Sequence, residues 1–199
     1  MLLVIGGVAV KRVRNWVELP FALVPSLFGI QQLIEGALWL TLPGNSPHLN
    51  AVLTQVYSAF SQVIWPIYIP VSVLLLERHV VRRRVMAALT LAGAAVSLFL
   101  LYYMAHRQVV AQVNGHHITY IFPHFHEAFA SGLYLLGACL SPLLSSHRYV
   151  RLFGIAVTLS LIATYAFYST WFISVWCFFS AILSSIVLLH FYEQRRGFT

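Results

Sequence analysis

The sequence contains no aspartate, and its acidic residues are five glutamates. Only 9% of its 199 residues are charged, whereas 60% are apolar and the mean hydropathy is +0.81. A soluble domain carries about a quarter charged residues. The shortage of charge therefore excludes an ordinary soluble domain and a disordered chain, and it indicates a protein whose surroundings are mostly lipid.

Cysteine and the usual catalytic motifs are also scarce or missing. The two cysteines, Cys139 and Cys177, lie in apolar runs, which excludes a small secreted module held by disulfides. No lysine lies inside an apolar segment, which excludes a retinal Schiff base, and without aspartate there is no Ser-His-Asp triad. The sequence therefore assigns no catalytic residue.

Basic residues divide the chain into apolar segments of the length that a membrane-spanning helix needs, about 20 residues. The first segment is only half as long, and it is not a signal peptide because the positive charges follow it. We predict an all-α, polytopic transmembrane helix bundle in a single domain, 1–199, with six full spans and a half-length N-terminal segment. The half-length segment is 1–10, and the spans are 19–42, 51–76, 85–105, 122–144, 152–168 and 171–190.

The distribution of positive charge predicts the orientation of these spans. Eleven of the 12 Lys and Arg residues lie in one set of loops and in the C-terminal tail, and Arg107 alone lies in the other set. Because Lys and Arg are retained on the cytoplasmic side, the C-terminus is expected in the cytoplasm and the N-terminus outside. We expect the basic clusters to contact anionic lipid headgroups and not nucleic acid.

One outer loop, 109–120, has the pattern of a short β-hairpin. Asn114 and Gly115 tolerate the positive φ that a type I′ turn requires, and β-branched residues flank them. A two-residue turn at this point predicts that Val113 pairs with His116 and that Ala111 pairs with Ile118.

Polar side chains inside two neighbouring spans form the candidate ligand site. Glu35 follows Gln31 and Gln32 by one helical turn, so the three share a helix face, and Gln55 and Gln62 lie on the facing span. Ionisable groups at membrane depth usually face the bundle interior or water. The alternative is that these groups form hydrogen bonds that only pack the helices.

Histidines at the outer end of the bundle form a tentative metal site. His124, His126 and Glu127 open the fifth span, and His106 ends the span before it. Imidazole and carboxylate suit a divalent metal such as zinc, although no H-E-x-x-H motif is present. Ordinary interfacial histidines are the alternative, and a bis-His haem is not favoured.

At the inner end, glutamates lie beside arginines. Glu77 precedes Arg78, and Glu193 lies two residues before Arg195, so we expect ion pairs at the level of the lipid headgroups. His190 is expected to be an interfacial residue.

Four stretches of the chain resemble a family of uncharacterised prokaryotic integral membrane proteins, classified as a domain of unknown function. They are LPFALVPSLFGIQQLIEGALWL (19–40), SQVIWPIYIPVSVLLLE (61–77), LSSHRYVRLFG (144–154) and SVWCFFSAILSSIVLLHFY (174–192). The resemblance implies a seven-helix architecture in the prokaryotic inner membrane, with a shortened N-terminus here, and it implies no activity.

Three functions remain open at the level of the sequence. The first is a small membrane protein that binds a ligand or ion in a polar cavity open to the outer face, as a sensor, carrier or accessory subunit. The second is a metal-dependent intramembrane enzyme acting on a lipid-like substrate. The third is a structural subunit, with a membrane-protein partner or a second copy of the chain.

Overall fold

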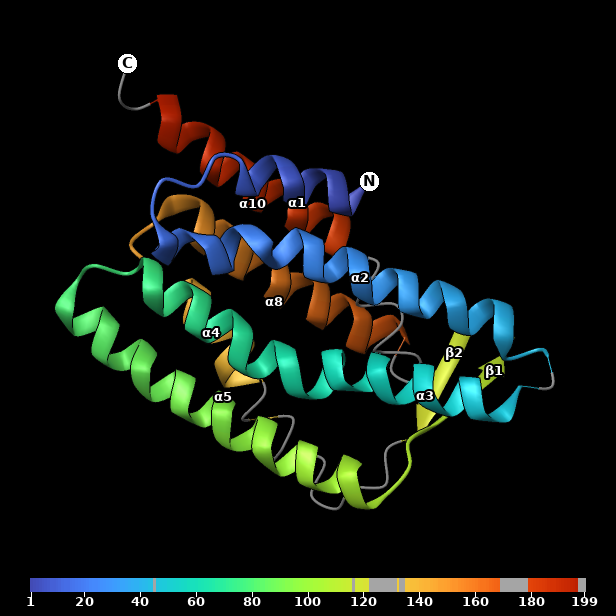
Figure 1. The fold of residues 1–199 in the computed structure, drawn as a ribbon. Coiled ribbons are helices and arrows are strands. Elements are labelled where there is room, and N and C mark those ends of the chain that lie inside the picture. The colour runs from blue at the N-terminus through green and yellow to red at the C-terminus, as the bar shows by residue number, and fades with distance from the viewer. Residues whose placement is uncertain (45, 116, 122–131, 133–134, 169–178, 197–199) are drawn as a thin grey trace.

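The computed structural model is a bundle of helices with one small hairpin at its end (Figure 1). It describes residues 1–44, 46–115, 117–121, 132, 135–168 and 179–196. The elements are α1 (Leu2–Val10), η1 (Trp16–Glu18), α2 (Leu19–Thr41), α3 (Pro47–Ser58), η2 (Ala59–Ile64), α4 (Trp65–Leu76), α5 (Val80–His106), β1 (Val110–Asn114), β2 (His117–Ile121), η3 (Leu136–Leu140), α7 (Ser141–Leu143), α8 (Arg148–Tyr168) and α10 (Ser180–Arg196).

Three helical stretches are long and apolar enough to cross a membrane, namely Trp16–Thr41, Pro47–Leu76 and Val80–His106. They correspond to the first three full spans expected from the sequence. The predicted segments 122–144 and 171–190 fall partly outside the described residues, so the full set of six spans stays a prediction.

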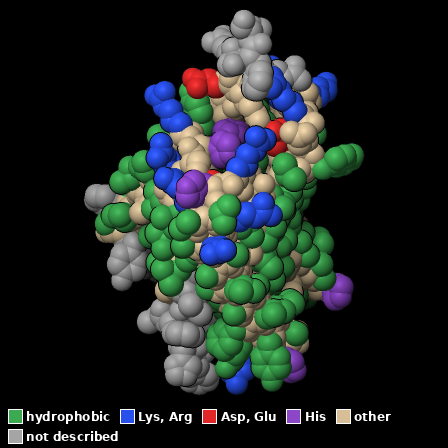
Figure 2. Space-filling view, turned by 90° about the vertical axis from the view of Figure 1, so that its left-hand side faces the viewer, with side chains coloured by type: hydrophobic (Ala, Val, Ile, Leu, Met, Phe, Trp, Pro, Cys, Tyr) green, Lys and Arg blue, Asp and Glu red, His purple; other side chains and the backbone are tan. Residues whose placement is uncertain are grey.

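The loops that carry the basic residues meet at one end of the bundle (Figure 1). The turns after α1, after α4 and before α8 lie there, together with the end of α10, and we call this end the basic end. Figure 2 views the molecule from this side and shows Lys and Arg side chains gathered around it. Arg107 follows α5 at the opposite end.

A wide helical turn interrupts the second long span. η2 is a π-helix, and Trp65 and Pro66 follow it directly. Because Pro66 has no backbone N–H, carbonyl groups in the preceding turn lose their usual partner. Ser97 of α5 donates its hydroxyl to the Val63 carbonyl at 2.8 Å, so a neighbouring helix compensates for part of this loss.

The same region brings α4 and α5 into very close contact. A Cβ atom added at Gly93 would lie 2.0 Å from the Pro66 carbonyl oxygen, and one at Gly137 would lie 3.0 Å from the same oxygen. Only residues without a side chain allow the helices to approach this closely.

The hairpin is present, but its register differs from the expected one. Asn114 pairs with His117 and Val113 with Ile118, so the turn lies one residue later than predicted. Gly115 has a positive φ of 62° and provides the left-handed backbone conformation of the turn. Asn114 keeps an extended conformation in β1, and the predicted pairing of Val113 with His116 is wrong.

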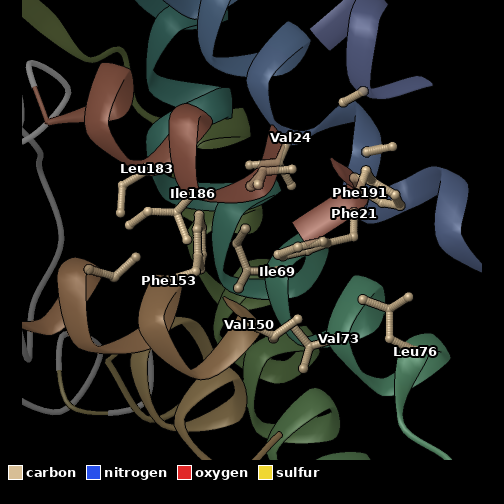
Figure 3. Close-up of a cluster of buried hydrophobic side chains, with 14 of the residues drawn as sticks. Phe21, Val24, Ile69, Val73, Leu76, Val150, Phe153, Leu183, Ile186 and Phe191 are labelled. Carbon is tan, nitrogen blue, oxygen red and sulfur yellow. The ribbon is translucent and has the colours of Figure 1, made fainter. Parts of the chain in front are cut away.

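The largest buried cluster lies in the half of the bundle near the basic end (Figure 3). Phe21 of α2 meets Phe153 of α8 edge to face, with 5.6 Å between the ring centroids. Val73 of α4 and Phe191 of α10 complete the contact among the four helices and are fully buried. A smaller cluster fixes the hairpin to α2 and α3 through Ile118.

Candidate functional site

Two polar side chains of α2 lie in the interior of the bundle. Gln31 is 0% exposed and Glu35 is 6% exposed. They are four residues apart and therefore occupy the same face of the helix. The Trp65 indole donates a hydrogen bond to Gln31 Oε1 at 2.6 Å, which fixes α2 against the start of α4.

The facing helix presents a row of hydroxyl groups at the same depth. Thr54, Ser58 and Ser61 are buried and follow one another at helical spacing. Because α2 and α3 are antiparallel and Gln31 bonds to Trp65, four residues along each helix bring Glu35 level with Ser61, and Ser58 follows about one turn further along.

The hydroxyl groups of this row differ in their hydrogen bonding. The Ser61 hydroxyl donates to the Ser58 carbonyl at 3.2 Å. The Ser58 hydroxyl is fully buried and has no hydrogen-bond partner among the described residues. Buried polar groups are nearly always paired, so this hydroxyl marks a place where a ligand or ordered water would complete the site.

The structure places the other three predicted ligand residues differently. Gln32 is half-buried at the edge of the α2 face, and Gln62 is half-buried within η2. Gln55 donates its side-chain amide to the Met104 carbonyl at 2.7 Å, near the end of α5. Gln31 and Glu35 are thus the buried members of the set, whereas Gln55 joins two helices.

Most of the tentative metal site lies outside the described residues, because His124, His126 and Glu127 fall in the segment 122–131. His106 is exposed, and its Nδ1 lies 2.8 Å from the Tyr102 carbonyl. Among the residues that are described, no group of three His, Cys, Asp or Glu side chains is placed to hold a metal ion. The metal site stays a prediction.

At the basic end, Glu77 has a different environment from the one we expected. It is 1% exposed and accepts the Arg78 and His79 backbone N–H groups at 3.1 and 2.9 Å. The Ser146 hydroxyl and backbone N–H donate to it at 2.7 Å each. Within the described residues, Arg78 contacts Glu77 through its backbone N–H and not through its guanidinium. The predicted ion pair between Glu77 and Arg78 is therefore wrong.

The hydrogen bonds of Glu77 determine its ionisation. Burial alone would raise the pKa of its carboxyl group. The hydrogen bonds from Ser146 and His79, together with the charge of His147, instead lower this pKa from 4.5 to about 2. Glu77 is therefore a charged structural group that joins the loop after α4 to the loop before α8.

A second buried carboxylate joins the two ends of the chain. Glu18 accepts the Arg14 backbone N–H at 2.8 Å and the Gln194 side-chain amide at 2.7 Å. Beside it, His190 is buried within the protein, and its Nε2 has no hydrogen-bond partner in the described chain. The His190 ring meets the His147 ring edge to face at 5.5 Å.

Sequence reasoning missed this cluster because neighbouring charges suggested ion pairs. Two local signals could have identified it. Glu77 follows an apolar segment directly, where backbone N–H groups of a turn are available. Ser145 and Ser146 precede Arg148 at the start of a helix, where serine hydroxyls commonly form hydrogen bonds.

The chain matches the model of DUF6629, described as a family of unknown function, over residues 1–198. The chain belongs to the DUF6629 family. The match covers almost the whole sequence and agrees with the domain of unknown function that the sequence stretches indicated. Comparisons with curated proteins and with solved structures gave no match. Membership of DUF6629 therefore assigns no activity to Gln31, Glu35 or the basic end.

Proposed function

We propose that this chain is an integral membrane protein that binds a small monovalent cation between α2 and the α3–η2 segment. The observation that carries the proposal is that Glu35 and the unpartnered Ser58 hydroxyl are both buried, on two helices that pack against each other. Such a site suits a sensor, a carrier or an accessory subunit.

The chemistry of the side chains favours a cation over an anion. Glu35 supplies one negative charge when ionised, and burial of that charge is costly unless hydrogen-bond donors or a positive charge accompany it. Hydroxyl and amide oxygens from Ser58, Gln31 and Gln32 are ligands of the hard, oxygen-preferring type. One carboxylate together with neutral oxygen ligands would balance one monovalent charge.

The proposal includes the arrangement in the membrane. We place six full spans and the half-length α1 in a prokaryotic inner membrane, with the basic end in the cytoplasm. The gathering of basic loops at one end supports this orientation through the positive-inside rule. Glu35 then lies in the outer half of the membrane, and the site opens toward the outer face.

The experiment uses the whole protein in nanodiscs and the reagent dicyclohexylcarbodiimide, which modifies protonated carboxyl groups in apolar surroundings. Labelling of Glu35 is followed by mass spectrometry in sodium, potassium, lithium and choline salts. We expect one of the metal cations to suppress labelling relative to choline. The same cation should stabilise the fold by about 2.7 kcal/mol at 100 times its Kd.

Two variants provide the comparison. Glu35→Gln should abolish the cation-dependent rise in melting temperature, whereas Glu193→Gln, which changes an exposed carboxylate, should preserve it. Equal labelling and equal melting temperatures in all four salts would overturn the proposal and favour a structural role for Glu35.

A further inference from the structure

A groove lies between α8 and α10, away from Gln31 and Glu35. Its volume is about 310 Å³. Its lining residues are Ala156, Leu159, Ser160, Ala163, Phe179, Ile182 and Leu183. Small side chains on α8 form the hollow, and larger apolar side chains on α10 form its other wall.

The lining offers an occupant no free polar group among the described residues. The Ser160 hydroxyl donates to the Val157 carbonyl at 2.8 Å and is therefore already bonded. Leu159 and Ile182, on the two walls, are 61% and 55% exposed, so the groove is continuous with the apolar outer surface. An occupant of this groove must be apolar along its whole length within it.

The groove runs along one helix face toward the basic end. Arg148, Leu152, Ala156, Leu159 and Ala163 follow one another at spacings of four, four, three and four residues. These spacings place all five on the same side of α8. The exposed Arg148 guanidinium thus stands at the end of the stripe that contains the groove.

The same pairing of helices continues from the groove to the basic end. Tyr149 of α8 donates its hydroxyl to Glu193 Oε1 of α10, so α8 and α10 remain in contact at the level of Arg148. Arg148 is the residue of the stripe that carries a positive charge.

Distances along the helix agree with the dimensions of one lipid leaflet. At 1.5 Å per residue, Ala156 lies about 12 Å and Ala163 about 22 Å from Arg148 along the axis. One leaflet is about 20–22 Å thick with its headgroup region, of which about 15 Å is hydrocarbon. The groove is therefore at the depth of the terminal half of an acyl chain whose headgroup lies beside Arg148.

We propose that α8 and α10 form a binding site for an anionic phospholipid of the leaflet at the basic end. One acyl chain lies in the groove between Ala156 and Ala163, and the phosphate lies beside Arg148. This site shares none of the Gln31, Glu35 or Ser58 contacts, so it is independent of the proposed cation site, and it rests on the proposed placement of α8 in the membrane.

The headgroup must supply the selectivity of such a site. Lipid tails are as apolar as the groove, so burial of a chain gains packing contacts and no hydrophobic free energy. One arginine near the membrane surface favours an anionic headgroup by about 1 kcal/mol. This corresponds to a preference of about five-fold for phosphatidylglycerol over phosphatidylcholine.

The test uses proteoliposomes that contain the full chain and phosphatidylglycerol with a diazirine at the end of one acyl chain. After photolysis, tandem mass spectrometry locates the label. We expect the label on the α8 stretch that contains Ala156 and Ala163, and we expect unlabelled phosphatidylglycerol to compete about five-fold better than phosphatidylcholine. A label spread equally over the exposed face of α5, at Leu91 and Leu98, would overturn the proposal.

Matched variants separate the chain from the headgroup. Ala163→Phe fills the groove and should reduce labelling of α8, whereas Ala88→Phe, at an exposed alanine of α5, should not. Arg148→Gln should abolish the preference for phosphatidylglycerol, whereas Arg84→Gln, at an exposed arginine remote from α8, should preserve it. Because the label is first located in the unaltered protein, misfolding of a variant cannot decide the result. Wild-type labelling of α8 without any headgroup preference would also overturn the site as proposed.

Discussion

At the scale of single residues, the buried carboxylates of this protein are stabilised by neutral donors. Glu77 accepts backbone N–H groups and the Ser146 hydroxyl, and Glu18 accepts a backbone N–H and the Gln194 amide. Hydrogen bonds to a charged group contribute more than neutral ones, about 1.5–3 kcal/mol each. The basic end therefore depends on the ionised state of Glu77.

The ionisation of Glu77 predicts a pH dependence of stability. Its pKa is about 2 in the folded protein and 4.5 ordinarily, so its contribution is complete above 4.5 and disappears as the pH falls toward 2. Glu77→Gln should lower the free energy of unfolding by about 2 kcal/mol at neutral pH. Melting curves of both proteins in nanodiscs measure the difference.

The difference between the two proteins should shrink as the pH falls from 4.5 to 2, because protonation removes the charge from the wild-type carboxylate. Glu193→Gln serves as the control, since Glu193 is exposed, and it should change the neutral-pH stability much less. A difference between wild type and Glu77→Gln that stays constant down to pH 2 would contradict the assigned pKa.

The sequence could identify which polar residues are buried in α2 but not which partners they have. Glu35 and Gln31 stand out because charged and amide groups are rare inside an apolar segment, and both prove to be buried. One partner of Glu77, Ser146, lies in a loop 69 residues later in the chain. Local reasoning about Arg78 could not predict a hydrogen bond that only tertiary packing creates.

At the scale of helices and strands, the close contact between α4 and α5 depends on glycine, which has no side chain. Gly93 allows α5 to approach the backbone of Pro66, beside the π-helix η2. Prolines such as Pro66 and Pro70 favour irregular helix geometry, and tertiary contacts such as the Ser97 hydrogen bond to Val63 stabilise the π-helix here.

Substitution of Gly93 tests this contact. A Cβ at this position would lie 2.0 Å from the Pro66 oxygen, so Gly93→Ala should force the helices apart and destabilise the fold by about 1–3 kcal/mol. Gly36→Ala is the matched control, because nothing lies within 4 Å of a Cβ there. The control should be neutral or stabilising by up to about 1 kcal/mol, since alanine favours a helix over glycine. Equal melting temperatures of the two variants would contradict the close approach.

The hairpin turn provides a second test at this scale. Gly115 has a φ of 62°, so Gly115→Ala should cost about 1–2 kcal/mol, whereas Gly115→Asn should cost less because asparagine tolerates this conformation. Hydrogen exchange of the β1 and β2 amides should be about five-fold faster in the alanine variant. Identical exchange in the alanine and asparagine variants would contradict the positive φ.

The hairpin also illustrates how far a turn motif predicts structure. Asn114 and Gly115 correctly indicated a hairpin between 109 and 120. Both possible registers place Ala111 and Ile118 on the same face of the hairpin. The alternation of side chains along the strands therefore did not distinguish one register from the other. Packing of Ile118 against Leu38 and Tyr57 favours the observed pairing.

At the scale of the whole molecule, charge separates the two ends of the bundle. The basic loops lie at one end, and Arg107 lies at the other (Figure 1). This asymmetry could be predicted from the sequence, because loop positions follow directly from the order of the apolar segments.

We expect a fluorescent protein fused after the C-terminus to fluoresce and alkaline phosphatase fused after Gly115 to be active. The reverse pattern would contradict the proposed orientation.

The hydrogen bond between Glu18 and Gln194 has a consequence for biosynthesis. Its two residues are 176 positions apart, so the ribosome must complete almost the entire chain before the bond can form. Until then the Arg14 N–H of the same loop is the partner available to Glu18. A chain truncated before α10 would lack the Gln194 donor, so its basic end should be less stable than that of the full chain.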